Sequence, residues 1–287
     1  AASPTPRQGT GVSAWDVTVF KGGVEQKGRV YANYLPLHMG AMGKLLYSKV
    51  YILTSHGILY RINLNGMEPW LFTFFANNRG FTDNHGNSLF KSVPLIGSLF
   101  HSPANDLTHK IFFNPPAADL PPYTNVPSND DLPAVSGTNT WLLATPKLPV
   151  VKDFTFVGKE GTAGQAGVFP LGGDFSFWTD TKAGTFMFMI DVDNNGIYGD
   201  GNDRQITGTS VIGTNTISWD GLDGLGSPVL PLAKPPYTYG AKLSLMIDDV
   251  HFPFFDIENN PIGLIVQRVN RTTLAIEDST VYYNDSD

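Results

Sequence analysis

The sequence predicts an all-β protein made of two antiparallel β-sandwich domains. Short runs of apolar and β-branched residues alternate with polar residues, which is the side-chain period of a strand. Gly, Pro, Asn and Asp separate these runs at the intervals typical of turns. Apolar residues at the spacing of about 3.6 that marks an amphipathic helix recur over no long segment. Hydrophobic residues make up 41% of the 287-residue chain, which is sufficient for a substantial core.

The first half of the chain contains the strand patterns of one domain. A hairpin is predicted around Gly57, because two alternating segments flank a short turn sequence there. Pro115 and Pro116 end the fifth strand, since proline cannot donate a backbone hydrogen bond to a neighbouring strand. The predicted strands are 15–20, 49–54, 58–63, 70–75, 109–113 and 140–144.

A change in composition marks the domain boundary. Residues 115–137 are rich in Pro, Asn, Asp and Ser and predict a long surface loop. The prolines of Thr145-Pro-Lys-Leu-Pro149 then predict a stiff, extended spacer. The expected organisation is therefore an extended N-terminal arm over 1–11, an N-terminal β domain over 12–149 and a second β-sandwich over 150–287.

The second half continues with strands separated by Gly, Pro and Asn turns. This spacing is typical of an antiparallel sandwich. The predicted strands are 154–157, 173–178, 184–191, 216–219, 241–247, 263–269 and 279–283.

Composition and charge limit the cellular setting and the partners. The chain has no cysteine, so disulfides and thiolate metal sites are excluded. The leading Ala-Ala-Ser-Pro-Thr-Pro is typical of a segment that follows signal-peptide cleavage, which predicts a secreted protein at the cell surface. No apolar run approaches the roughly 20 residues that span a bilayer. The net charge of −7 and the lack of a basic patch argue against nucleic acid as a partner.

Residues 191–203 have the spacing of oxygen-bearing side chains that is typical of a metal-binding loop. Asp191, Asp193 and Asn195 stand at alternate positions, and Gly196 allows the sharp turn that follows. A backbone coiled around a cation could direct these side chains to one point, and Ca²⁺ takes about six to eight hard oxygen ligands. The predicted cofactor is Ca²⁺, and its predicted ligands are Asp191, Asp193, Asn195, Ile197 through its carbonyl oxygen, Asp200, Asn202 and Asp203.

The same segment has a simpler interpretation as a solvated turn between two strands, since Asn, Asp and Gly tolerate a left-handed backbone. It also differs from an EF-hand. Position twelve is Asn202 rather than the bidentate Glu, and the predicted flanks are strands rather than helices. A calcium loop on a β scaffold, with a structural role, is the favoured prediction.

A second motif lies just after this loop and resembles the W-D-G-x-D-x-x-G-x-x-V turn of bacterial Ig-like domains. Those domains occur in flagellar hook-capping proteins and in modular secreted surface proteins and adhesins. The resemblance covers about residues 150–287 and implies an Ig-like sandwich with the Trp in the core and the Asp-Gly turns shaping a hairpin. The chain departs from the pattern at 230–237, which is longer than the family's segment. The residues that carry it are Trp219, Asp220, Gly221, Asp223, Gly226 and Val229.

The leading functional hypothesis is a non-enzymatic, calcium-stabilised structural or adhesive protein of the extracellular surface. No P-loop, Gly-x-Ser-x-Gly or His-Glu-x-x-His motif is present. The expected partners are other copies of the chain, in a surface fibre, or a ligand on a host or environmental surface. Residues 1–11 or the strand 280–283 could add to the sheet edge of a neighbouring copy.

Two alternatives remain open from the sequence. A secreted carbohydrate-binding module would present one or two of the tryptophans at its surface. A glycoside hydrolase would need two facing carboxylates, for which Asp248, Asp249, Asp256 and Glu258 are the candidates.

Overall fold

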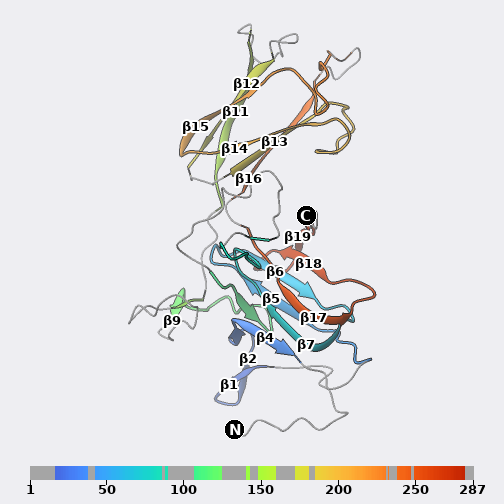
Figure 1. The fold of residues 1–287 in the computed structure, drawn as a ribbon. Helices are drawn as coiled ribbons and strands as arrows, with labels where there is room; N and C mark the ends of the chain where they lie inside the picture. The colour runs from blue at the N-terminus through green and yellow to red at the C-terminus, as the bar shows by residue number, and fades with distance from the viewer. Residues whose placement is uncertain are drawn as a thin grey trace. The chain divides into compact units, whose positions relative to one another are not determined.

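The computed structural model describes residues 17–37, 43–85, 88–89, 107–124, 140–142, 148–159, 172–180, 185–230, 232, 238–246 and 249–281. In this part of the chain the regular structure consists of β-strands without helix, which confirms the all-β prediction. Consequently, these residues contain no helix long and apolar enough to cross a membrane. The chain divides into two compact units (Figure 1).

The strands pair antiparallel throughout. They are β1(Val19–Lys21), β2(Val24–Gln26), β3(Tyr31–Ala32), β4(Tyr34–Leu37), β5(Lys49–Leu53), β6(Leu59–Asn63), β7(Glu68–Phe75), β8(Lys110–Phe112), β9(Tyr123–Thr124), β10(Thr140–Trp141), β11(Val151–Gly158), β12(Gly173–Thr179), β13(Thr185–Asp191), β14(Arg204–Thr209), β15(Gly213–Trp219), β16(Gly240–Met246), β17(Phe254–Asn259), β18(Ile265–Val269) and β19(Ile276–Asp278).

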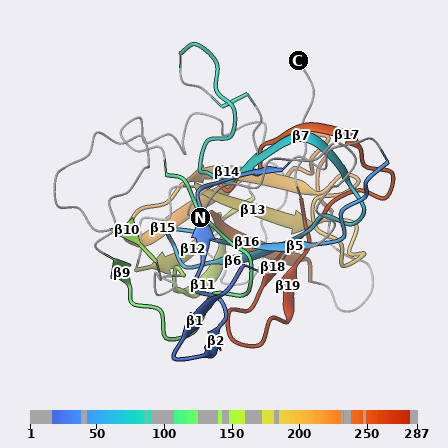
Figure 2. The same cartoon turned by 90° about the horizontal axis from the view of Figure 1, so that it is seen from below.

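The first unit is a sandwich of two sheets. One sheet has the order β19-β18-β6-β5-β8-β3 and the other has the order β17-β7-β4. Side chains from both sheets, among them Ile52 and Ile62 on one and Phe72 and Phe74 on the other, form a single buried cluster. Figure 2 shows β7 and β17 as one layer and β5, β6 and β18 as the other. The hairpin predicted around Gly57 is present as β5 and β6.

The second face of the six-stranded sheet is also covered. Leu53, Leu59, Phe112, Leu120 and Val269 form a separate buried cluster there. The sheet is therefore enclosed on both sides near β5 and β8, and this explains why all three residues of β8 are buried.

The prediction that residues 150–287 form one domain is wrong. β17 pairs with β7, with Phe254 opposite Phe74, and β18 pairs with β6, with Ile265 opposite Asn63. The described residues from Asp249 onward therefore belong to the first unit, and the second unit is inserted between β10 and β17. Figure 1 shows red β18 beside blue β6. Pairing between strands about 200 positions apart leaves no signal in a local hydrophobic pattern.

The second unit, which covers the described residues from Leu148 to Met246, is a smaller sandwich. Its sheets have the orders β11-β12-β15 and β14-β13-β16. Phe177 and Trp219 from the first sheet and Phe188 and Ile190 from the second share one buried cluster. Side chains of β12 alternate strictly between buried and half-buried, as expected for a strand with one face on the core.

Candidate metal site

The loop between β13 and β14 gathers three carboxylates because of the hairpin that it closes. Ile190 pairs with Arg204, so Asp191, the last residue of β13, lies across from Asp203, which directly precedes β14. Asp193 follows two positions after Asp191. The strand register therefore brings together residues that are 12 positions apart in the chain.

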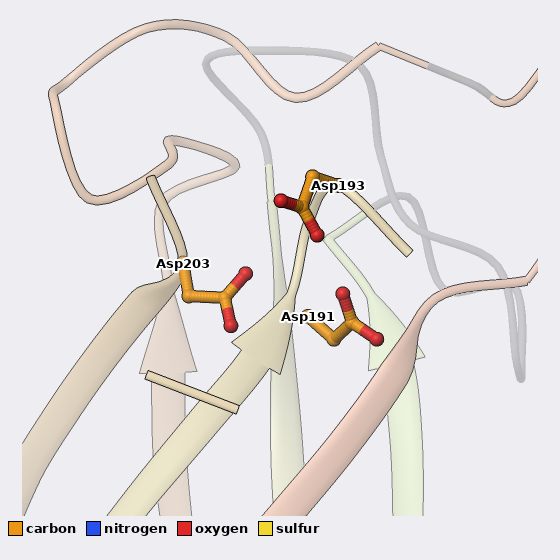
Figure 3. Close-up of side chains that lie close together, drawn as sticks. All are labelled: Asp191, Asp193 and Asp203. Carbon is orange, nitrogen blue, oxygen red and sulfur yellow. The ribbon is translucent and has the colours of Figure 1, made fainter. Parts of the chain in front are cut away.

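Asp191, Asp193 and Asp203 offer carboxylate oxygens that all lie within 4.8 Å of one another (Figure 3). Asp191 is 2% exposed and Asp203 is 8% exposed, whereas Asp193 is exposed. Like charges at this separation repel, and a bound cation would compensate this repulsion.

Backbone N–H groups hold the two buried carboxylates in place. The N–H groups of Asn195 and Gly196 donate to the two oxygens of Asp191, at 3.1 Å and 2.9 Å. Two further N–H groups, of Val192 and Gly199, each donate to Asp203 at 2.9 Å. The loop therefore curls around these carboxylates, and the positive φ of 82° at Gly196 permits the turn.

The side chain of Asn195 occupies the space between two further carboxylate groups. Its Nδ2 donates to Asp193 at 3.1 Å and to Asp200 at 3.2 Å. Its Oδ1 accepts from the Ile197 N–H at 2.7 Å, so the amide would give up this bond if it turned to present Oδ1 to a cation. Asn195 thus holds, through its NH₂ group, a position that suits a positive charge.

The electrostatics of Asp193 reflect this crowding. Desolvation raises the pKa of its carboxyl group above the ordinary value, and the charges of Asp200 and Asp203 raise it further, against the lowering effect of the Asn195 N–H. The Asp193 carboxyl group thus takes up a proton more readily than an ordinary Asp, and a bound cation would reverse that preference.

The remaining predicted ligands lie at different distances from this group. Asp200 borders it through Asn195, and its Oδ1 is buried without a hydrogen-bond partner among the described residues. The side chain of Ile197 is 60% exposed, in agreement with the expectation that only its carbonyl could serve. Asn202 is turned away, because its Nδ2 donates to Asp223 at 3.1 Å.

The donor set fits a hard cation. Every candidate ligand atom is a carboxylate, amide or carbonyl oxygen, which is the chemistry that Ca²⁺ selects. Three clustered carboxylates with Asn195 and Asp200 beside them could supply most of a shell of about six to eight oxygens.

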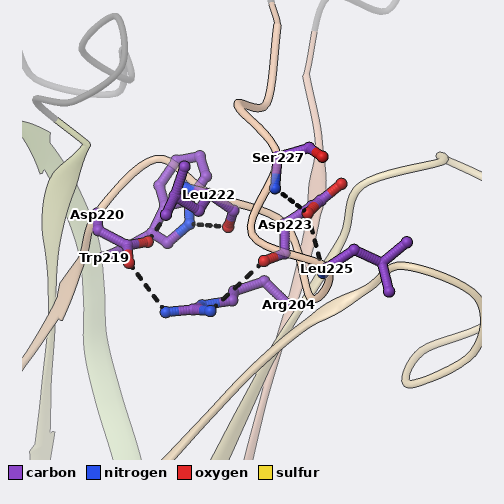
Figure 4. A network of polar contacts seen from close by, with 7 residues as sticks. All are labelled: Arg204, Trp219, Asp220, Leu222, Asp223, Leu225 and Ser227. Carbon is purple, nitrogen blue, oxygen red and sulfur yellow. Dashed lines mark hydrogen bonds and ion pairs between the residues drawn. The ribbon is translucent and has the colours of Figure 1, made fainter.

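A network of polar contacts joins the Asp191–Asp203 loop to the turn that follows β15 (Figure 4). Arg204 donates to the Asp220 carboxylate at 3.0 Å and to the Asp223 carbonyl at 3.4 Å. The Gly224 N–H donates to the Asn202 carbonyl at 2.7 Å. Sequence reasoning did not predict this connection, because it joins segments about 20 positions apart through a contact that no local pattern indicates.

Trp219 anchors the same turn in the core. It is 4% exposed, and its Nε1 donates to the Leu222 carbonyl at 2.9 Å. The Asp220 carboxylate accepts from the Leu222 N–H at 3.1 Å. The Trp-Asp-Gly sequence therefore forms a packed, hydrogen-bonded corner, and the expectation of a core Trp at this position is confirmed.

Within the part of the chain that the structure describes, the other predicted features contribute no second candidate site. Asp249 lies 4.0 Å from His251 and Glu258 is exposed. Among the tryptophans with described side chains, Trp219 is buried and Trp178 lies under Lys152, whose Nζ is 4.2 Å from the ring centroid. Residues 1–16, Asp248, Tyr282 and Tyr283 lie outside the described residues, as do the side chains of Asp256, Trp70 and Trp141.

Comparison with known proteins provides no family assignment. No family model matches the chain, and neither the curated proteins nor the solved structures contain a match. The class that the fold defines is an all-β protein of two units, and the assignment of function rests on the geometry of the site.

Proposed function

We propose that the chain is a non-enzymatic, extracellular structural or adhesive protein whose second unit is stapled by Ca²⁺ in the Asp191–Asp203 loop. The observation that carries the proposal is the cluster of three carboxylates within 4.8 Å, two of them buried. A cation would relieve the repulsion between the carboxylates of such a cluster. Calcium binding would therefore stabilise the loop and the hairpin that it closes.

The strand order of the second unit supports an Ig-like sandwich. Its first, second and fifth strands form one sheet, and its fourth, third and sixth form the other. These neighbours correspond to the A-B-E and C′-C-F strands of immunoglobulin domains, without strands D and G. The resemblance of the Trp219 turn to bacterial Ig-like domains points in the same direction.

A structural role fits the surroundings of the loop better than a reaction centre. Asn202 and Arg204 tie the end of the loop to the Trp219 corner, so a cation there would connect two parts of one sandwich. A chain without cysteine has no disulfide to provide this connection. Calcium is abundant outside cells, where weak modules with dissociation constants of roughly 10⁻⁴–10⁻³ M bind it.

The proposed partners are other copies of the same chain. β11 is an edge strand of its sheet and exposes apolar side chains, among them Phe154 at 42% and Val157 at 41%. Exposed edges of this kind favour pairing with another chain. Sedimentation velocity over a range of concentrations in calcium buffer tests it, and a concentration-independent monomer would argue against a fibre.

Thermal unfolding with chelator and with millimolar Ca²⁺ tests the calcium site. Binding to the folded state alone adds about 2.7 kcal/mol at a hundredfold excess over the dissociation constant, so the melting temperature should rise. Asp193→Asn should abolish most of this rise. Asp153→Asn is the matched control, because Asp153 is an exposed acid of the same unit outside the loop. No rise in the wild type, or an equal rise in Asp193→Asn, contradicts the proposal.

A further inference from the structure

Lys110 is a lysine in the interior of the first unit. It begins β8, which lies between β5 and β3 in the six-stranded sheet, and it is 1% exposed. Charged side chains are almost never buried to this extent without a specific reason. The proposed calcium site lies in the other unit and does not explain why Lys110 is buried.

The strand register places Asn33 directly opposite Lys110. Tyr31 pairs with Phe112 and Ala32 pairs with Ile111, so the next cross-strand pair is Asn33 with Lys110. Cβ atoms of such a pair lie about 5 Å apart and their side chains share one face of the sheet. The two side chains meet there, with Lys110 Nζ 3.1 Å from Asn33 Oδ1.

The pair lies beside apolar side chains. Phe112 is two residues from Lys110 on the same strand and belongs to the buried cluster with Leu53, the strand partner of Lys110 on β5. The ring of Tyr31 lies on the other side, with its centroid 5.5 Å from Nζ. Nζ therefore faces both the Asn33 side chain and the Tyr31 ring, and attack on the amide requires the neutral amine, which is a nucleophile.

We propose that Lys110 and Asn33 form an intramolecular isopeptide bond. The Nζ lone pair attacks Asn33 Cγ, and the Cγ–Nζ bond forms as the Cγ–Nδ2 bond breaks. A proton from Nζ passes to the departing nitrogen, which leaves as ammonia. The step is an amide exchange without oxidation or reduction, so it requires no co-reactant. The folded sheet supplies the proximity, because it holds Nζ within hydrogen-bond distance of the Asn33 amide whose Cγ it attacks.

The bond would connect the N-terminal part of the first unit to an inner strand. Asn33 and Lys110 are 77 positions apart, and a covalent link across them constrains the unfolded chain as a disulfide does. It would provide a covalent staple in a chain without cysteine.

The intact mass of the full chain under denaturing conditions tests the bond. The wild type should be lighter than its sequence mass by one ammonia, and Lys110→Arg and Asn33→Ala should each have the full sequence mass. Lys159→Arg, at an exposed lysine, is the control and should keep the deficit. Tryptic digestion of the wild type should leave the chain uncut after Lys110 and yield one branched peptide that contains both residues.

Succinimides at Asn65-Gly66 or Asn195-Gly196 would also lose ammonia, so the mass is measured again after hydroxylamine treatment. Hydroxylamine opens succinimides and leaves an isopeptide bond intact. A wild-type mass equal to the sequence mass, a deficit that hydroxylamine removes, or a deficit that persists in Lys110→Arg each overturns the proposal. The mass of the denatured chain shows whether the bond is present, and it can be measured even for a variant that does not fold.

Discussion

Asn202 and Asp223 are joined by a side-chain hydrogen bond of 3.1 Å, although 21 positions separate them in the chain. The bond connects the end of the Asp191–Asp203 loop to the turn after β15. Hydrogen bonds lower the pKa of the Asp223 carboxyl group, against the effect of desolvation. The Ser227 N–H, at 2.7 Å, lowers this pKa most, and the contacts with Asn202 and Leu225 lower it further. Asp223 is therefore a buried carboxylate that is held by hydrogen bonds in its charged form.

Asp223→Ala should destabilise the second unit. The change leaves the N–H groups of Leu225 and Ser227 and the Asn202 amide without their common acceptor, and it should cost about 2–3 kcal/mol. Equilibrium urea denaturation measures the loss. Asp220→Ala is the comparison, because it removes a partly exposed ion pair with Arg204 and the acceptor of a single N–H, that of Leu222, and should cost only about 1 kcal/mol. Equal losses in the two variants would contradict a special role for Asp223.

Trp219→Phe should weaken the core of the same sandwich. The change removes the bond from Nε1 to the Leu222 carbonyl and part of a buried ring, at a combined cost of about 2–3 kcal/mol. The measurement is the urea midpoint of the second unit's transition.

Trp178→Phe provides the comparison for this prediction. Trp178 is half-buried and contacts the Lys152 side chain at the surface, so the same chemical change should cost about 1 kcal/mol or less. If Trp178→Phe is as destabilising as Trp219→Phe, burial of the corner is not what makes Trp219 important.

The part of the candidate site that sequence predicts is the part encoded locally. Asp191, Asp193 and Asn195 stand two positions apart, and a hairpin loop brings such residues together whatever the rest of the fold does. Asp203 joins them because the register of one hairpin determines its partner. Alternating patterns likewise predicted most strands of the second unit, since one face of each packs on a shared core.

Contacts between distant segments could not be predicted in this way. Nothing in the local pattern of β17 or β18 indicates that they pair with β7 and β6 across the inserted unit. The same limit applies to the Asn202–Asp223 bond. Such pairs depend on which surfaces the whole fold brings together, and period-two alternation is the same for every possible partner strand.

Gly224→Ala should separate the Trp219 corner from the Asp191–Asp203 loop. A Cβ at this position would lie 2.4 Å from the Asp203 carbonyl oxygen, so a backbone segment of the loop would have to move. We expect a loss of about 1–3 kcal/mol, as in other overpacked sites, together with weaker calcium binding by titration calorimetry. Ser227→Ala is the control, because Ser227 supports the turn through its backbone N–H and carbonyl groups, which the change keeps. Unchanged calcium affinity in Gly224→Ala would show that the contact is dispensable for the loop.

His109 should make the stability of the first unit depend on pH. Burial lowers the pKa of its ring from the ordinary 6.5 to about 3, and the charges of His56, Lys110 and His251 lower it further. The unfolded chain therefore takes up a proton below pH 6.5 that the folded chain does not. Stability should fall as pH decreases from 6.5 toward 3, by about 2 kcal/mol at pH 5 relative to pH 7.

Urea denaturation at pH 7 and pH 5 measures this difference, and the interval lies above the range in which paired carboxylates such as Asp174 begin to titrate. His109→Leu should remove most of the pH dependence. It should also raise stability at pH 5, because both ring nitrogens are buried without hydrogen-bond partners among the described residues. His85→Gln changes an exposed histidine and should keep the wild-type dependence. If His109→Leu retains the full loss between pH 7 and pH 5, the proton is taken up elsewhere, and burial of His109 does not govern the acid sensitivity of the sheet.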